Sequence, residues 1–477
     1  MGQEIQTTAY QDADYQRFLQ RLRAETELLG KFIQDRVCSE EPPVAGFEIE
    51  AWLLYDDMRP APLNESYLQS FSHPMATPEL AKFNVEMNTT PVPLTGDVLG
   101  RLHRNLSNTW KQAELHAQEM DLNLMMIGTL PTLQQHELNL NNMSNMNRYR
   151  VLNQQVLAGR EKPIVLDICG REHLRIEHHD VMLESATTSF QLHIQCPLSV
   201  AHHFYNASIL ASAPMVAVCA NAPYLFGKDL WMETRIPMFE QAIALGGYQG
   251  AAEGPLHRVS FGSDFARYSI LECFTENLQH FPILLPESFD DAPEMFSHLR
   301  LHNGTVWRWN RPLVGFDKDG TPHIRIEHRV PAAGPTVLDS IANAAFFYGL
   351  LKNLCDECLA GQVDLSFAQA KDNFYQAARY GLDSHVTWFG ERKVRLASLI
   401  ESELMPRAEK GLHSLGIDLD DSRVYLDLIR QRITNQQTGS HWQRRFIKDN
   451  PGDFIELTKL YLQQQRRGEA VADWGFC

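Results

Sequence analysis

The sequence predicts an α+β fold, in which β-strands lie mostly before residue 331 and helices dominate after it. This segregation is typical of an antiparallel sheet packed by helices and not of a regular βαβ array. Two further observations support the fold class. Several short segments alternate strictly between polar and apolar residues, as half-buried strands do, and two long apolar segments have the length of buried helices.

The most informative predicted strand covers residues 322–330, because its polar face combines His323, Arg325, Glu327 and Arg329. The opposite face holds isoleucine and valine. Two arginines that flank one glutamate suit an anionic ligand and a cation held together.

Three other predicted strands carry related polar faces. The polar sets are Glu48 and Glu50 in residues 46–52, Glu86 in residues 83–88, and Gln191 and His193 in residues 189–195. Carboxylates two residues apart on a strand are about 6.6 Å apart at the backbone, so they can converge on one cation or bridge two. Because gathered carboxylates repel one another, the pattern predicts Mg²⁺. The predicted ligands are Glu48, Glu50, Glu86 and Glu327, with His193 completing one site.

The alternative is that these faces are solvated outer faces, since antiparallel sheets often have one wet side. None of the four faces carries a lysine, although lysine is the usual residue on a merely solvated strand edge. The combination therefore favours a binding site. For Trp307, Trp309 and Arg311 two interpretations stay open: they line a substrate pocket, or they belong to a core strand whose arginines reach solvent.

The remaining elements follow from apolar periodicity. Amphipathic helices are predicted over residues 15–37 and 99–120, a buried strand over 122–128, a helix over 148–159, and short strands over 164–168 and 173–176. A long helix covers 335–358. From residue 367 the pattern is helical almost to the end, with segments 392–412, 422–433, 440–448 and 453–465. The Gln-, Arg- and Lys-rich stretch 441–467 predicts a solvent-facing helical surface.

Composition narrows the class of protein. The chain has 477 residues and a net charge of −16, which argues against non-specific nucleic-acid binding. The apolar runs 207–226 and 335–351 contain Pro214, Asn221, Asp339 and Asn343, so they predict buried helices and no membrane span. The N-terminus shows no signal-peptide pattern. Eight cysteines in a chain of this length, with a lone C-x-x-C at Cys355 and Cys358, predict no disulfide framework and a cytoplasmic location.

Familiar nucleotide and hydrolase motifs do not occur in the sequence. There is no Gly-x-x-x-x-Gly-Lys-Ser/Thr loop, no Gly-x-Gly-x-x-Gly run after a strand, no Gly-x-Ser-x-Gly elbow and no His-Glu-x-x-His. Any handling of phosphate must therefore depend on metal ions and arginines.

Residues 45–354, about two thirds of the chain, resemble the glutamate–cysteine ligase family in its bacterial carboxylate–amine ligase branch. The matching runs occur in the family's order. They are Gly-Phe-Glu-Ile-Glu (46–50), Asn-Val-Glu-Met-Asn-Thr-Thr-Pro (84–91), Thr-Thr-Ser-Phe-Gln-Leu-His (187–193), Ala-Pro-Met-Val-Ala-Val-Cys-Ala-Asn-Ala-Pro (213–223), Glu-Thr-Arg (233–235) and Arg-Ile-Glu-His-Arg-Val-Pro-Ala-Ala-Gly-Pro-Thr (325–336).

The resemblance implies a glutamine-synthetase-like fold, with a curved antiparallel sheet that binds ATP and two or three Mg²⁺ ions on one face and helices on the other. Mn²⁺ could substitute for Mg²⁺. The implied metal ligands are Glu48, Glu50, Glu86, His193, Glu327 and Glu79. The implied catalytic residues are Arg329, which would contact the transferring phosphate or the acceptor carboxylate, and Glu327. The implied substrate-binding residues are Arg235, Arg325, Arg311 and Gln191.

The function implied is an ATP-dependent ligase that joins an amino-acid carboxylate, that of the glutamate side chain, to an amine such as cysteine through an acyl phosphate. Alternatives are a phosphotransferase on the same scaffold and a nucleotide- or metabolite-binding protein without turnover. Residues 1–365 are predicted to form the catalytic domain. Residues 366–477 are predicted to be a helical extension packed on it, which could serve as a homo-oligomer contact or a lid. Small-molecule substrates are the expected partners, with no nucleic acid and no membrane.

Overall fold

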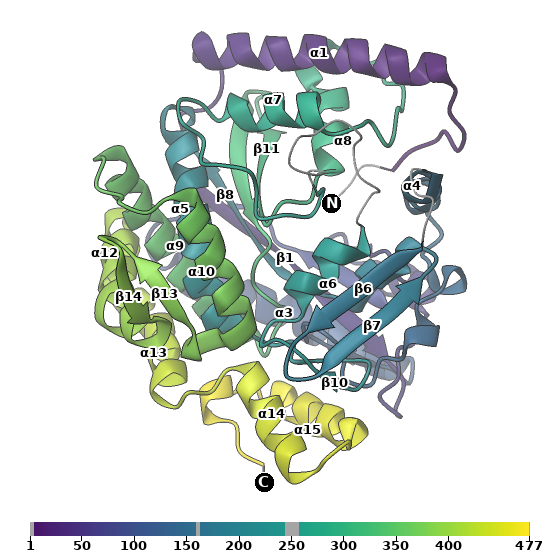
Figure 1. Cartoon of the computed structure of the whole chain (residues 1–477), viewed down its shortest axis with the longest axis vertical. Coiled ribbons are helices and arrows are strands. Elements are labelled where there is room, and N and C mark those ends of the chain that lie inside the picture. The colour runs from purple at the N-terminus through teal and green to yellow at the C-terminus, as the bar shows by residue number, and fades with distance from the viewer. Residues whose placement is uncertain (1–3, 159–162, 244–256, 477) are drawn as a thin grey trace.

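The computed structural model describes residues 4–158, 163–243 and 257–476, and an antiparallel sheet lies at its centre (Figure 1). Six strands follow one another in the order β11 (Asn310–Phe316), β12 (Pro322–His328), β8 (Phe190–Cys196), β1 (Val44–Leu54), β3 (Asn84–Asn88) and β2 (Ala76–Pro78). β4 (Val92–Pro93) and β5 (Asn123–Met125) also pair with β1. The predicted α+β class and all four polar-faced strands are confirmed.

The sheet forms because each strand has one apolar side to bury. Phe47 and Ile49 of β1, Leu192 of β8 and Ile326 of β12 are all at most 2% exposed. They lie on the side away from the polar sets described above, as strict alternation requires. Tyr348 supports this side, because its hydroxyl donates to the backbone carbonyls of Gly46 at 3.2 Å and His193 at 3.3 Å.

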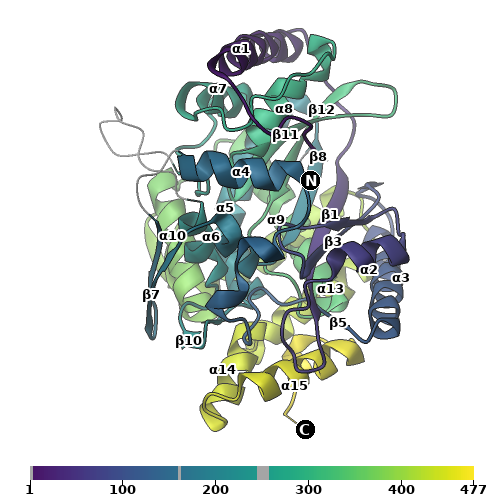
Figure 2. The same cartoon turned by 90° about the vertical axis from the view of Figure 1, so that its right-hand side faces the viewer.

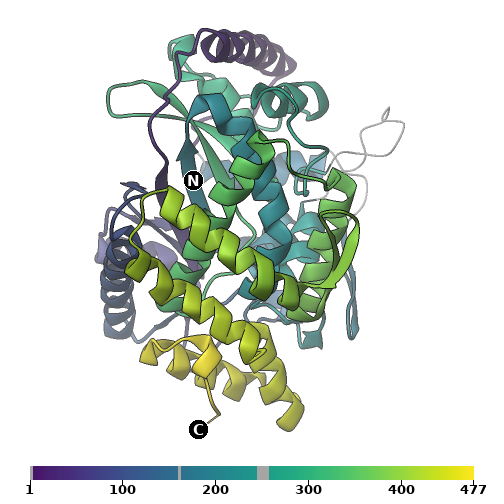
Figure 3. The ribbon, with the colours of Figure 1, turned by 90° about the vertical axis from the view of Figure 1, so that its left-hand side faces the viewer.

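The two long apolar runs form the helices α5 (Ala201–Cys219) and α9 (Val337–Leu359), which pack on each other. α12 (Met405–Ser414) crosses α9 where Gly349 and Gly411 meet, and a Cβ on either glycine would collide with the opposing carbonyl. Figure 3 shows the yellow-green helices α12 and α13 (Leu419–Thr434) lying across this outer side. Among the residues that the structure describes, none of the helices is long and apolar enough to span a bilayer.

The other helices surround the sheet. α1 (Asp12–Gln34) lies over α7 (Leu271–His280) and α8 (Ser297–Gly304) at the top of Figure 1. Figure 2 shows α2 (Asn64–Phe71) and α3 (Val98–Glu119) beside β1 and β3. α4 (Asn147–Ala158), α6 (Arg235–Ala242) and the hairpin β6–β7 (Ile164–Cys169, His173–His178) complete this half, with a small β9–β10 ribbon (Tyr224–Leu225, Lys228–Asp229). Most predicted helices are shifted by only a few residues.

One prediction for the C-terminal part is wrong. After α10 (Phe367–Tyr380), the chain forms a hairpin of β13 (His385–Trp388) and β14 (Arg392–Arg395) where a helix was predicted to begin at residue 392. Val386 and Trp388 are buried and favour a strand. Gly390 has a φ of +73°, which ends the strand in a tight turn. Helical structure resumes at α11 (Leu396–Leu399), with a π-helical stretch (Ile400–Leu404) before α12.

The predicted solvent-facing surface over residues 441–467 is also wrong in part. α14 (Gly439–Asp449) and α15 (Phe454–Arg467) lie at the base of Figure 1 and bury several of their polar side chains. Gln465 accepts from the backbone N–H of Met126 at 3.0 Å and donates to its carbonyl at 2.8 Å. Gln443 donates to Asn221 at 3.1 Å. Composition predicted exposure because glutamine is usually exposed, but here its amides satisfy buried backbone groups.

Candidate active site

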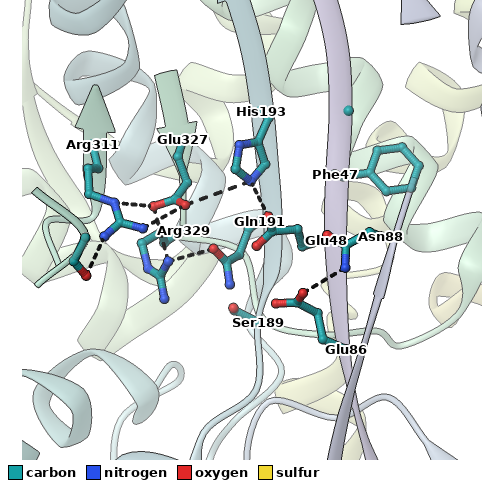
Figure 4. A network of polar contacts seen from close by, with 12 residues as sticks. Phe47, Glu48, Glu86, Asn88, Ser189, Gln191, His193, Arg311, Glu327 and Arg329 are labelled. Atoms are coloured by element: carbon teal, nitrogen blue, oxygen red, sulfur yellow. Dashed lines mark hydrogen bonds and ion pairs between the residues drawn. The ribbon is translucent and has the colours of Figure 1, made fainter. Parts of the chain in front are cut away.

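The polar side chains of the sheet gather on one side because the strand registers match (Figure 4). Directly opposed residues of antiparallel strands project from the same face. The opposed pairs on this face are Glu50 and Glu86, Glu48 and Gln191, Glu327 and His193, and Arg311 and Glu327. Five strands, drawn from four separate parts of the sequence, thus contribute to one surface.

One cluster on this surface combines two carboxylates with an imidazole. Ligand atoms of Glu48, His193 and Glu327 lie within 4.8 Å of one another, and all three residues are buried. The Nε2 atom of His193 is 3.4 Å from Glu48 Oε1 and 3.9 Å from Glu327 Oε1. Although burial opposes ionisation of Glu48, the neighbouring imidazole helps to hold the pKa of that carboxyl well below its usual range. In the described part of the chain, neither buried nitrogen of His193 has a hydrogen-bond partner.

A second cluster consists of carboxylates alone. Oxygens of Glu50, Glu79 and Glu86 lie within 4.8 Å of one another. Burial, followed by the charge of Glu79, raises the pKa of Glu50 to about 7. Burial and the neighbouring Glu48 and Glu79 raise the pKa of Glu86 well above its usual value. Without a cation these raised pKa values favour protonation of Glu50 and Glu86, and a divalent ion can displace such protons.

Both clusters fit Mg²⁺. The second offers only oxygen ligands, which is the donor set that this ion prefers, and the first offers the buried Nε2 of His193, which a metal would satisfy. Neighbouring donors orient the carboxylates. Glu50 accepts from Ser189 N at 2.6 Å and from Gln191 Nε2 at 2.8 Å, and Glu86 accepts from Asn88 Nδ2 at 2.8 Å.

Two arginines also donate hydrogen bonds to the carboxylate of Glu327. Arg311 donates from Nε at 2.8 Å and from a terminal nitrogen at 3.0 Å, one bond to each carboxylate oxygen. Arg329 donates to the same carboxylate at 3.2 Å and to Gln191 Oε1 at 2.7 Å. Burial would raise the pKa of Glu327, but the two guanidinium groups hold it far below the usual range. Glu327 is therefore ionised at neutral pH.

The other predicted substrate-binding residues differ in how far they are engaged. Gln191 bridges Glu50 and Arg329. Arg325 lines the cavity, and its buried Nε has no hydrogen-bond partner within the described ranges. Arg235 also lines the cavity, but its terminal nitrogens donate to Glu233 at 3.3 Å and to the backbone carbonyls of Val330 at 3.1 Å and Arg329 at 3.2 Å. These bonds tie Arg235 to neighbouring parts of the fold, and its predicted binding of a substrate carboxylate stays a prediction.

A cavity of about 530 Å³ opens beside these groups. It is lined by all the predicted site residues except His193, which lies at its edge beside Glu48 and Glu327. Trp307 and Trp309 also line it, so the pocket-wall interpretation of these residues is the one that the geometry supports. The cavity is large enough for a nucleotide-sized ligand.

Five residues that line the cavity were not predicted from the sequence. They are Arg148 and Tyr149 of α4, Glu184 of a short 3-10 helix (Val181–Ala186), Phe239 of α6 and Arg300 of α8. Arg148 donates to the Tyr149 hydroxyl at 2.6 Å. Burial, then the charge of Glu79, raises the pKa of Glu184 to about 8. None of these residues lies on an alternating strand, so no local pattern marks them. The only available signal was a charged residue on an otherwise buried segment.

Comparison with known proteins identifies the family. A model of glutamate–cysteine ligase family 2 matches residues 45–472. The match extends beyond the segment in which the resemblance was noted, through the C-terminal helices. The division at residue 365 stays a prediction. No protein of curated function matches the sequence at a significant level.

Two solved structures share the fold. A glutamate–cysteine ligase from Francisella tularensis, in complex with AMP, aligns with a TM-score of 0.56 and 12% identity over 91% of each chain. A bifunctional glutathione synthetase from Pasteurella multocida aligns with a TM-score of 0.50 and 11% identity, over 92% of this chain and 55% of that one. At these identities the likeness confirms the glutamine-synthetase-like fold and leaves the ligands of the site open.

Proposed function

We propose a specific reaction for this chain, which belongs to glutamate–cysteine ligase family 2 and is an ATP-dependent carboxylate–amine ligase. The side-chain carboxylate of an amino acid of the glutamate type would attack the γ-phosphorus of ATP and release ADP. An amine such as that of cysteine would then attack the acyl carbon, so that an amide forms and phosphate leaves. Small molecules are the only partners that this reaction requires.

The observation that carries this proposal is the juxtaposition of two acidic clusters with fixed arginines in one cavity. The first cluster (Glu48, His193, Glu327) and the second (Glu50, Glu79, Glu86) would each hold Mg²⁺. When bound, Mg²⁺ neutralises the charge of the polyphosphate. The protein itself contributes mainly position and electrostatics, as in other phosphoryl transfers.

Arg329 is suited to the charge that develops during transfer. Its guanidinium is fixed by Glu327 and Gln191 and lines the cavity. A fixed guanidinium requires little reorganisation when negative charge spreads over the transferring oxygens. Arg311 would act on Glu327 by holding its carboxylate ionised and oriented. Glu327 thus couples the arginines to the metal ligands.

Trapping of the acyl phosphate tests the mechanism. Purified protein with ATP, Mg²⁺, glutamate and hydroxylamine should form a hydroxamate in step with ADP, because hydroxylamine can replace the amine. Aspartate and other carboxylic acids should be tested in parallel, with cysteine and other amines as acceptors. Glu327→Gln should lose hydroxamate formation, and Glu27→Gln, a change at an exposed position of α1, should retain it.

Other outcomes would support different functions. ADP formation that depends on an acid, without hydroxamate from any acid, would exclude an acyl phosphate and favour the phosphotransferase. Nucleotide binding without ADP formation in any mixture would favour a binding protein without turnover.

A further inference from the structure

A second cavity, of about 510 Å³, lies away from the candidate active site, where the β6–β7 hairpin and β10 approach α14 and the end of α10 (lower half of Figure 1). It shares no lining residue with the first cavity. Its basic lining residues are Arg171, Arg379, Arg444, Arg445 and Lys448, and its acidic ones are Asp229 and Asp383. With histidine neutral, five positive and two negative side chains leave a net charge of +3, in a chain whose net charge is −16.

The two carboxylates are already engaged. Asp229 accepts from Arg444 Nε at 2.8 Å and lies 3.5 Å from Arg171. Asp383 is paired with Arg395, which does not line the cavity, at 2.6 Å. In the ranges that the structure describes, the three remaining cationic side chains have no carboxylate within ion-pair distance. They are Arg379, Arg445 and Lys448.

Aromatic contacts hold the two unpaired arginines in place. The guanidinium of Arg379 lies over the ring of Trp231, 4.6 Å from its centroid. Trp231 is itself fixed, because its indole N–H donates to the carbonyl of Cys169 at 2.9 Å. Arg445 lies over Phe476 at 5.7 Å. A cation held over an aromatic face loses less freedom when it binds a ligand than a solvated side chain does.

We propose that this cavity, the Trp231 pocket, binds a compact anion that carries phosphate groups. Guanidinium forks match the geometry of phosphate oxygens, and a nearby ammonium adds a point charge. Arg379 covers one face of the Trp231 ring and the residue is only 7% exposed, so the ring offers no free face for stacking a nucleobase. This arrangement favours inorganic pyrophosphate or the phosphate tail of a nucleotide as the source of the anion.

Cys169 provides a reporter, because its thiol is free and exposed and lines the pocket. Inorganic pyrophosphate should protect Cys169 from alkylation, as followed by peptide mass spectrometry at constant ionic strength and without divalent metal. If only the free form reacts, a pyrophosphate concentration about ten times the Kd should slow alkylation by about tenfold. Cys358, a free cysteine outside the pocket, is the internal control; burial raises its pKa to about 12, so it should react slowly, at a rate that pyrophosphate does not change.

The double variant Arg379→Ala/Arg445→Ala should lose this protection because it lacks two of the proposed anion-binding groups. It should keep the fold, because both arginines are exposed and neither has an ion pair within the described ranges. Arg423→Ala, a change at an exposed arginine of α13, should retain it. Glu327→Gln should also retain it, because the active site is separate. Protection by ADP would identify the nucleotide tail as a source, and protection by pyrophosphate alone would identify the inorganic anion. Absent or non-saturable protection, or protection that persists in the double variant, would overturn the proposal.

Discussion

The carboxyl of Glu240 connects the cavity wall to the C-terminal helices, and its burial predicts a pH-dependent contribution to stability. Its Oε1 accepts from Trp309 Nε1 at 2.9 Å and from the hydroxyl of Tyr375, on α10, at 2.8 Å. Burial raises the pKa of Glu240 to about 7, and the two donors offset only part of the effect. At mildly acidic pH the carboxyl is therefore neutral in the folded protein and ionised in the unfolded chain.

Glu240→Gln keeps both accepted hydrogen bonds and removes the titration. Against an ordinary pKa of 4.5, the raised value corresponds to about 3 kcal/mol of folding free energy. Between these two pKa values the unfolded chain binds fewer protons than the folded one, so wild-type stability falls as pH rises through this window. The variant should therefore gain about 2.5 kcal/mol over wild type between about pH 5 and about pH 8.

Urea unfolding followed by circular dichroism, at several pH values across this window, measures the difference. Other buried carboxyls titrate equally in both proteins, so their contributions cancel when the two curves are subtracted. Glu27→Gln, at an exposed position of α1, should run parallel to wild type at every pH. If the difference between Glu240→Gln and wild type is the same at both ends of the window, Glu240 ionises normally and the reasoning fails.

Three further predictions concern the site and its support. Removing one charge from a metal cluster, by Glu48→Gln, Glu86→Gln or Glu327→Gln, should weaken Mg²⁺-supported nucleotide binding by about tenfold or more. Calorimetry tests this, and an unchanged Mg²⁺ dependence in all three variants would exclude metal binding by these residues. Arg329→Lys keeps the charge but loses the planar fork, so turnover should fall by about tenfold or more and ATP affinity by less. Equal losses in steady-state kinetics would place Arg329 in ground-state binding. Arg432→Met would leave Asp339 buried without its ion-pair partner, which lies 2.8 Å away and links α13 to α9. This change should lower the free energy of unfolding in urea by about 3–5 kcal/mol. A loss below about 1 kcal/mol would show that the ion pair does not hold the two helices together.

The sequence predicted those site residues whose position follows from the alternation of side chains along a strand. Alternation alone places Glu48 and Glu50 on one face of β1, and Glu327 and Arg329 on one face beside β12. It could not predict that Glu48 joins His193 and Glu327 while Glu50 joins Glu79 and Glu86. That division depends on which strands pair and in what register, and register is a property of non-local contacts.

Residues outside the strands were harder to predict for a different reason. Arg148 and Glu184 reach the cavity from helical segments whose periodicity shows only that one side is buried. Glu79 came from the family resemblance alone, because it follows a three-residue strand that carries no pattern. The β13–β14 hairpin was missed because its strands have four residues each, too few for alternation to be distinguished from a helical period.

The order of the strands gives the site a direction. Arg311 on β11 and Arg325 on β12 lie at one end of the sheet, and Glu50 on β1 and Glu86 on β3 lie toward the other, with β8 between them. An acidic half therefore adjoins a half rich in guanidinium groups, to which Glu327 of β12 also belongs. In the proposed reaction, polyphosphate with its metal ions would lie in the acidic half, and a substrate carboxylate would lie in the basic half, where arginines can bind it. Phosphoryl transfer would then occur over β8, where His193 and Gln191 contact both halves.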